Sequence, residues 1–140
     1  IYYFKNIILR RNLKMALTNA GRDFITQVIA NDGSPVFFNS ANSHIGVGDS
    51  TTAFVASQTD LQASSNKTRK GMEAGFPTRT NNQLVFKSSF GTTEANFAWQ
   101  EWGVFNASSG GVMLNRKVEN LGTKSGGNWL LTVTLTINIS

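Results

Sequence analysis

The stretch "NWLLTVTLTINIS" at residues 128–140 decides the fold class, because apolar and polar side chains alternate along most of it. Six apolar residues occupy every second position, and threonines or an asparagine stand between the later ones. A period of two places all six on one face of an extended chain. They are Trp129, Leu131, Val133, Leu135, Ile137 and Ile139. The segment therefore predicts a long, half-buried β-strand.

Shorter segments of the same character fill most of the chain before this strand. We expect strands over 44–49, 67–76, 83–90 and 97–105, and a strand that returns after the turn "NASSGG" at 106–111. Asn81 and Asn82 tolerate the positive φ that a hairpin turn requires, so they are expected to join the strands 67–76 and 83–90. The regular spacing of turns is typical of stacked antiparallel sheets.

One segment has helical spacing instead. Apolar residues recur at three- and four-residue intervals between Thr18 and Asn31, Thr18 or Asn19 can cap the start, and "NDG" at 31–33 ends the pattern. The sequence as a whole therefore predicts a mainly β protein, an antiparallel β-sandwich of jelly-roll-like type with one short N-terminal helix.

The first fourteen residues are strongly basic. They contain four of the thirteen basic residues and no acid, so the remaining nine basic and eight acidic residues leave the body at +1 of the total +5. "MALTNAGRDF" from Met15 resembles an ordinary protein start, which makes 1–14 an upstream extension. The alternative is a basic arm that docks on a neighbouring subunit, with Tyr2, Tyr3, Phe4, Arg10 and Arg11 as interface candidates. Residues 15–140 form a single β-sandwich domain in either case.

Enzymatic chemistry finds little support in the residue types. Cysteine is absent and His44 is the only histidine, which excludes thiol nucleophiles and two-histidine zinc motifs. Glu94 and Glu101 are the one pair of acids near tryptophans, but seven residues of extended chain separate them by roughly 23 Å. We therefore expect no enzyme activity, no catalytic residues, no metal and no cofactor.

Two short motifs suggest ligands at first sight. "GVGDS" at 46–50 lacks the lysine and the spacing of a phosphate loop. "KTRK" at 67–70 is basic but has no flanking aromatic residue for base stacking, and an edge strand protected by lysine explains it better. No segment has the length and apolarity of a membrane span. We expect neither nucleic acid nor membrane as a partner.

The stretch "WQEWGVF" at 99–105 holds the main interface candidates, Trp99 and Trp102. Their odd spacing predicts that the two rings face opposite sides of a regular strand, one in the core and one outward or covered by a neighbour. Glu101 shares a side with Trp99. If that side is inward, the carboxylate needs a partner, and Arg116 on the returning strand is the expected one.

The order of these motifs resembles small virion proteins of tailed bacteriophages, especially the N-terminal domain of phage tail-collar fibre proteins. The similar segments are Thr18 to Gly21, Ile45 to Asp49, Gln58 to Leu61, and Glu101 to Phe105 followed by Gly110 and Gly111. The resemblance covers most of 17–118, and its motifs describe a fold more than an activity. Members of that family continue into a long shaft, whereas this sequence stops at Ser140.

The resemblance implies a non-enzymatic structural protein that is made in the bacterial cytoplasm and located in the virion. Its partners are then further copies of itself and other virion proteins. A tail, collar or baseplate adaptor, or a fibre-attachment subunit, is the expected role. A capsid decoration protein that stabilises the head lattice is the alternative, and a carbohydrate-binding module with an exposed tryptophan is a further one.

Overall fold

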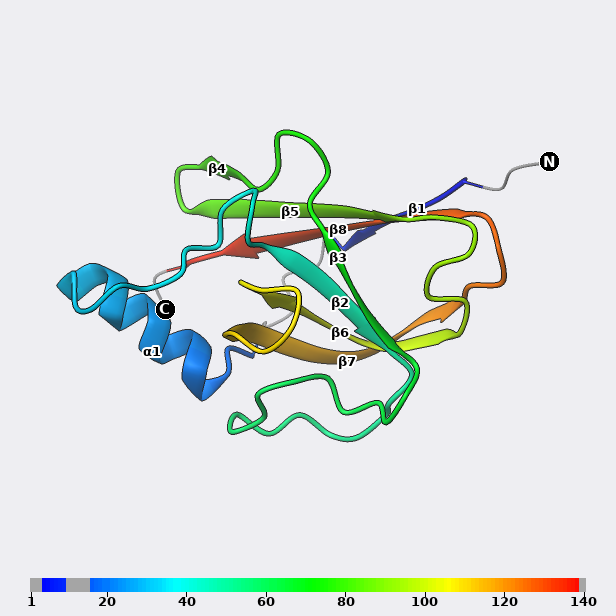
Figure 1. Ribbon diagram of the computed structural model, residues 1–140, viewed down its shortest axis with the longest axis horizontal. Helices are drawn as coiled ribbons and strands as arrows, with labels where there is room; N and C mark the ends of the chain where they lie inside the picture. The colour runs from blue at the N-terminus through cyan, green and yellow to red at the C-terminus, as the bar shows by residue number, and fades with distance from the viewer. Residues whose placement is uncertain (1–3, 10–15, 139–140) are drawn as a thin grey trace.

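The structure is a computed structural model that describes residues 4–9 and 16–138, and its strands form two sheets that pack face to face (Figure 1). The first sheet has the order β1 (Phe4–Leu9), β8 (Asn128–Thr136), β5 (Gln83–Phe90), β4 (Thr78–Thr80). The second has the order β3 (Lys67–Gly71), β2 (His44–Gly48), β6 (Ala98–Phe105), β7 (Met113–Thr123). The predicted β-sandwich with a short helix near its N-terminal end is confirmed.

Strand β8 coincides with the segment that indicated the fold. Trp129, Leu131, Val133 and Leu135 are buried, and the threonines between them are half-buried. The alternation ends before Ile137, whose side chain lies beyond β8 and is exposed. β8 pairs with β5 in an unshifted antiparallel ladder from Trp129 to Thr136. The strand is therefore an inner strand of the first sheet.

The predicted hairpin of 67–76 with 83–90 is wrong. β3 pairs with β2 in the second sheet, whereas β5 pairs with the three-residue β4 on one side and with β8 on the other. The turn between β4 and β5 contains Asn81 at φ 52°, so the asparagine signal was placed correctly. The error arose because the chain passes from one sheet to the other between Gly71 and Thr78, which local patterns do not reveal.

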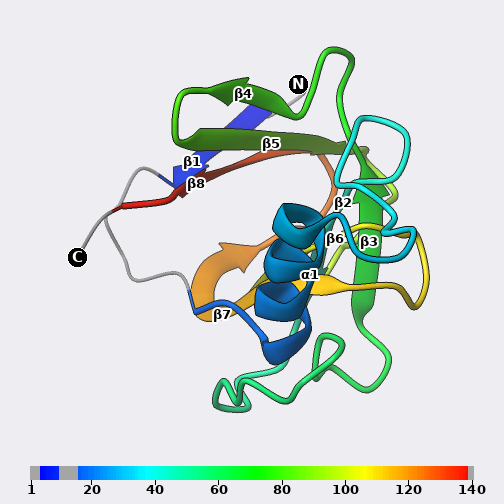
Figure 2. The same cartoon turned by 90° about the vertical axis from the view of Figure 1, so that its left-hand side faces the viewer.

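Helix α1 (Asn19–Ala30) has the predicted ends. The Thr18 hydroxyl accepts a hydrogen bond from the Gly21 amide at 2.9 Å, and Asn31 closes the helix in the left-handed conformation. α1 lies across one end of the sandwich (Figure 2). Gly21 is its one buried residue, and a Cβ at this position would collide with the Leu114 backbone of β7. The glycine therefore sets how closely the helix approaches the sheet.

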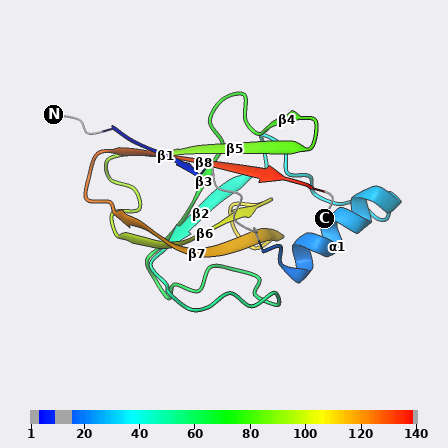
Figure 3. The ribbon, with the colours of Figure 1, turned by 180° about the vertical axis from the view of Figure 1, so that it is seen from behind.

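Residues 4–9, within the segment considered as an N-terminal arm, form β1. This strand pairs in parallel with β8, from Phe4 opposite Asn128 to Leu9 opposite Val133 (Figure 3). Every other strand pairing is antiparallel. β1 thus forms one edge of the first sheet, although it comes from the opposite end of the chain.

Candidate functional site

The two faces of β6 have different surroundings. Trp102 and Val104 face the first sheet and belong to the main core, together with Ile45 and Val47 of β2. Phe105 lies with Leu61 and Met113 in a second, smaller cluster. That cluster forms on the opposite side of the sheet, where the loop of residues 49–66 runs along it (Figure 1). We call this segment the outer loop.

A buried ion pair fastens the outer loop to the sheet. Arg116 Nε donates to Glu101 Oε2 at 2.6 Å, and neither side chain is exposed. The carboxylate also accepts hydrogen bonds from the backbone amides of Gln62 at 3.0 Å and Ala63 at 2.8 Å. The structure thus joins Glu101 and Arg116, the pair that the sequence suggested.

The guanidinium of Arg116 completes the attachment at the other end of the loop. It donates to Gln58 Oε1 at 3.0 Å and to the Thr52 carbonyl at 2.8 Å. Both charges are therefore compensated by each other and by hydrogen bonds, as buried charges require. The pair holds the outer loop at both of its halves, which is a structural function.

The two glycines of "GVGDS" serve the same arrangement. A Cβ at Gly46 would lie 2.7 Å from the Phe105 ring, and one at Gly48 would lie 2.5 Å from Glu101 Oε1. β2 therefore lacks side chains on the face where the outer loop and the carboxylate pack. This close approach accounts for the glycines without any phosphate ligand.

The expected positions of the tryptophans need correction. Trp99 is 0 % and Trp102 2 % exposed, and both rings belong to the same core cluster. The β6–β7 ladder shifts register between Trp99 and Glu101, so the alternation of sides does not carry through this point. Trp99 packs edge-on against Phe90 and Trp129. Neither tryptophan is an outward interface residue in this chain.

The burial of the tryptophans also bears on carbohydrate binding. Trp129, the third tryptophan, is 8 % exposed. Trp102 directs its indole N–H to Glu119 at 3.2 Å, and Trp99 directs its own to the Ala95 carbonyl at 2.9 Å. No tryptophan ring therefore offers a free face to a sugar, and the exposed tryptophan that this hypothesis required is not found.

The basic residues of "KTRK" are engaged by acids. Asp60 of the outer loop contacts Lys67 at 2.7 Å and Arg69 at 2.9 Å. Burial raises the pKa of Asp60, but the hydrogen bonds from Lys67 and Arg69 outweigh it and bring the pKa below its ordinary value. Arg69 also stacks on the Phe105 ring at 3.5 Å and donates to the Ala107 and Gly110 carbonyls.

The surroundings of Asp60 include a small open pocket of about 220 Å³, lined by Asp60, Leu61, Lys67, Thr68, Arg69, Ser108, Ser109 and Gly110. Its charged side chains are already paired with each other, so they act as a clamp between β3, the outer loop and the turn at 106–111. β3 is an edge strand of the second sheet, as the sequence analysis expected.

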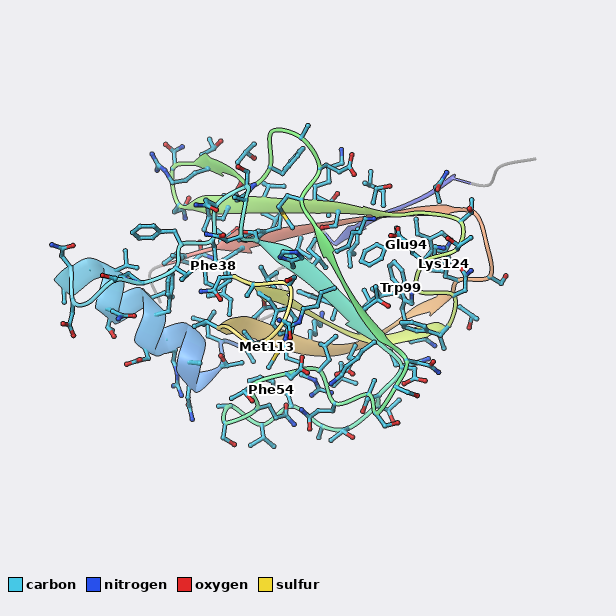
Figure 4. All side chains as sticks on the ribbon, in the orientation of Figure 1. Phe38, Phe54, Glu94, Trp99, Met113 and Lys124 are labelled. Carbon is cyan, nitrogen blue, oxygen red and sulfur yellow. The ribbon has the colours of Figure 1, made fainter. Side chains whose placement is uncertain are left out.

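A second polar cluster closes the far end of the sandwich. Glu94 contacts Lys70 at 2.6 Å and accepts from the Gly91 amide, and the hydrogen bond from Lys70 lowers the pKa of Glu94. Lys124 donates to the Gly91 carbonyl at 2.6 Å and to Asn96 at 2.8 Å, and burial lowers its pKa. Figure 4 shows Glu94 and Lys124 near each other beside Trp99. These contacts fix the 91–96 loop.

Several apolar side chains are exposed at the end of α1 and in the segment that follows it. Ile29 is 80 % and Phe37 54 % exposed, and Val28 and Val36 are exposed beside them in the chain. We call these four residues the helix tip. In the sequence, Val28 and Ile29 served only as part of the helical spacing between Thr18 and Asn31, and this surface was missed. The signal was the apolar run at 36–38 directly after the turn that ends the helix.

The other predicted interface residues belong to the N-terminal segment. Tyr2, Tyr3, Arg10 and Arg11 lie outside the described residues, and Phe4 is the first residue of β1. Among residues 4–9 and 16–138, no group of three or more metal-ligating side chains comes together. His44 Nδ1 lies 2.8 Å from the Asn42 carbonyl, at the start of β2. No helix within this part of the chain is long and apolar enough to cross a bilayer.

No protein-family model matches the chain, and a search of curated proteins finds no match either.

Proposed function

We propose that this chain is a non-enzymatic structural subunit of a tailed-phage virion, which associates with its own copies and docks on other virion proteins as a tail, collar or baseplate adaptor or fibre-attachment subunit. The resemblance to phage tail-collar fibre proteins supplies the class. The helix tip carries the proposal, because all four of its apolar side chains are exposed, and exposed apolar surface is typical of protein contacts.

The roles of the residues that carry the resemblance support the same class. Thr18 caps α1 and Gly21 seats it on β7. Gly46 and Gly48 make room for the outer loop, which Glu101 holds. These residues are thus explained by packing, which supports a structural subunit.

The experiment is a double substitution in the helix tip, Ile29→Glu with Phe37→Glu, analysed by light scattering over a range of concentrations. The wild-type chain is expected to exceed the monomer mass, and the variant to form smaller assemblies with unchanged thermal stability. Thr51→Glu with Ser64→Glu is the matched control, since both residues are exposed on the outer loop and the charge change is equal. Assembly that the tip substitution leaves unchanged, or that the control reduces equally, contradicts the proposal.

Capsid decoration is the alternative role within the same class. A decoration protein and a tail adaptor both attach by an exposed surface, so the helix tip serves either one. Cryo-electron microscopy of intact particles distinguishes them by position, because a decoration protein repeats over the head lattice and an adaptor is confined to the tail or collar.

A further inference from the structure

Four strands form the lateral edges of the sandwich, and three of these edges carry protection against unwanted pairing. β3 bears basic side chains held by Asp60 and Glu94. β4 has only three residues. β7 shifts register and is bridged by Leu17, and the Thr18 amide donates to its Leu114 carbonyl. Charges, short length, irregularity and covering segments are the ways in which natural sheets block their edges.

The fourth edge is different. β8, the neighbour of β1 in the sheet, is nine residues long. It has no charged residue and no proline, and its ladder with β5 has no register shift. β1 covers it through six consecutive residue pairs, and β1 pairs with no other described strand. Among the described strands, β8 therefore lacks the features that block the other three edges, and β1 alone covers it on this side.

We propose that the edge of β8 that β1 covers is a strand-acceptor site, and that its occupant in the assembled state is β1 of a second copy. The register of Phe4–Leu9 on Asn128–Val133 shows that this segment fits the edge in parallel orientation. An identical segment from another copy makes the same main-chain hydrogen bonds. Exchange of an element between identical chains needs no new interface chemistry.

The position of the two strands in the chain favours this exchange. β1 is the first and β8 the last strand, so no turn between them dictates that they come from one molecule. The core residues of β8 pack on their own sandwich whichever copy supplies β1. This inference rests on the proposed function, since it names a second contact, besides the helix tip, by which copies associate.

The test is disulfide trapping, which is clean because the chain has no cysteine. Ile8 and Thr132 are paired in the register. Chains carrying Ile8→Cys and chains carrying Thr132→Cys are co-expressed with different tags and oxidised. The matched control replaces Thr132→Cys by Thr80→Cys, on the strand at the opposite edge of the same sheet.

Strand exchange predicts several-fold more covalent heterodimer from the Ile8→Cys and Thr132→Cys chains than from the control pair. Yields equal to the control, together with efficient closure of a disulfide within single chains of the Ile8→Cys/Thr132→Cys double variant, overturn the inference. Light scattering of the untrapped chain separates the two proposals. An oligomer without interchain trapping leaves the proposed function standing and removes strand exchange, whereas a monomer at all concentrations removes both.

Discussion

Replacing Arg116 by methionine tests the ion pair that fastens the outer loop. The substitution keeps a long apolar stem but leaves Glu101 buried with only the amides of Gln62 and Ala63 as partners. Gln58 and the Thr52 carbonyl lose their donor at the same time. Removing one member of a buried pair leaves an uncompensated charge, which costs about 3–5 kcal/mol. We expect the free energy of unfolding to fall by that amount.

The fall corresponds to a decrease in melting temperature of roughly 10–20 °C for a domain of this size. Circular dichroism during urea and thermal unfolding measures it, and limited proteolysis reports release of the outer loop. Lys117→Met is the matched control on the next residue of β7. Lys117 contacts Glu119 at 3.2 Å near the surface, and its loss is expected to cost less than about 1 kcal/mol.

A further variant separates the pair from simple packing. Replacing Arg116 and Glu101 together by methionine removes both charges, so it should recover part of the stability lost in Arg116→Met. The recovery is expected to be incomplete, because the backbone amides of Gln62 and Ala63 lose the carboxylate that accepts their hydrogen bonds. An Arg116→Met protein as stable as the Lys117→Met control would refute the role assigned to the pair.

Three other substitutions test the packing of β2, the core and the 91–96 loop. Gly48→Ala should destabilise the protein by about 1–3 kcal/mol in a urea titration, because the added Cβ would collide with Glu101. Gly71→Ala is the control and should change the stability little, because the nearest neighbour of its Cβ would be His44 at 3.8 Å. Trp102→Ala should cost about 3–5 kcal/mol of folding stability, and a variant that lost assembly with unchanged urea midpoint would contradict the buried position. The pKa of Glu94 is lowered, so its ionised carboxylate stabilises the fold at pH values above its ordinary pKa of 4.5, and this contribution disappears as the pH falls through the lowered pKa. The acid unfolding profiles of wild type and Glu94→Gln should therefore converge at low pH. Profiles that stay parallel over the whole pH range would argue against this contribution.

The elements with strong local signals were predictable from the sequence. β8 follows from its period of two, and the bounds of α1 follow from Thr18 at one end and Asn31 at the other. Both signals act within a few residues, so they are independent of the rest of the fold. The Glu101–Arg116 pair was also predictable, because strands joined by a short turn bring such residues within reach of each other. In the β6–β7 ladder the two residues are diagonal neighbours, since Glu101 lies opposite Val118 and Arg116 lies opposite Gly103.

The features that failed depend on contacts between distant segments. The side on which Trp99 lies is set by a register shift in the β6–β7 ladder, which involves both strands and leaves no mark in β6 alone. The assignment of β3 to the second sheet depends on its pairing with β2. The role of Gly46 and Gly48 depends on where the outer loop packs. The exposed helix tip depends on how little of α1 the sheets cover, which the helical pattern does not encode.

The central claim is that the chain works as a building block of a phage particle, and quantitative mass spectrometry of purified particles whose genome encodes it tests this most directly. The account predicts that the chain co-purifies with the particles in a fixed ratio to the major capsid or tail proteins through successive density gradients. Recovery of the chain only in the soluble fraction of the lysate, with none in infectious particles, would contradict it.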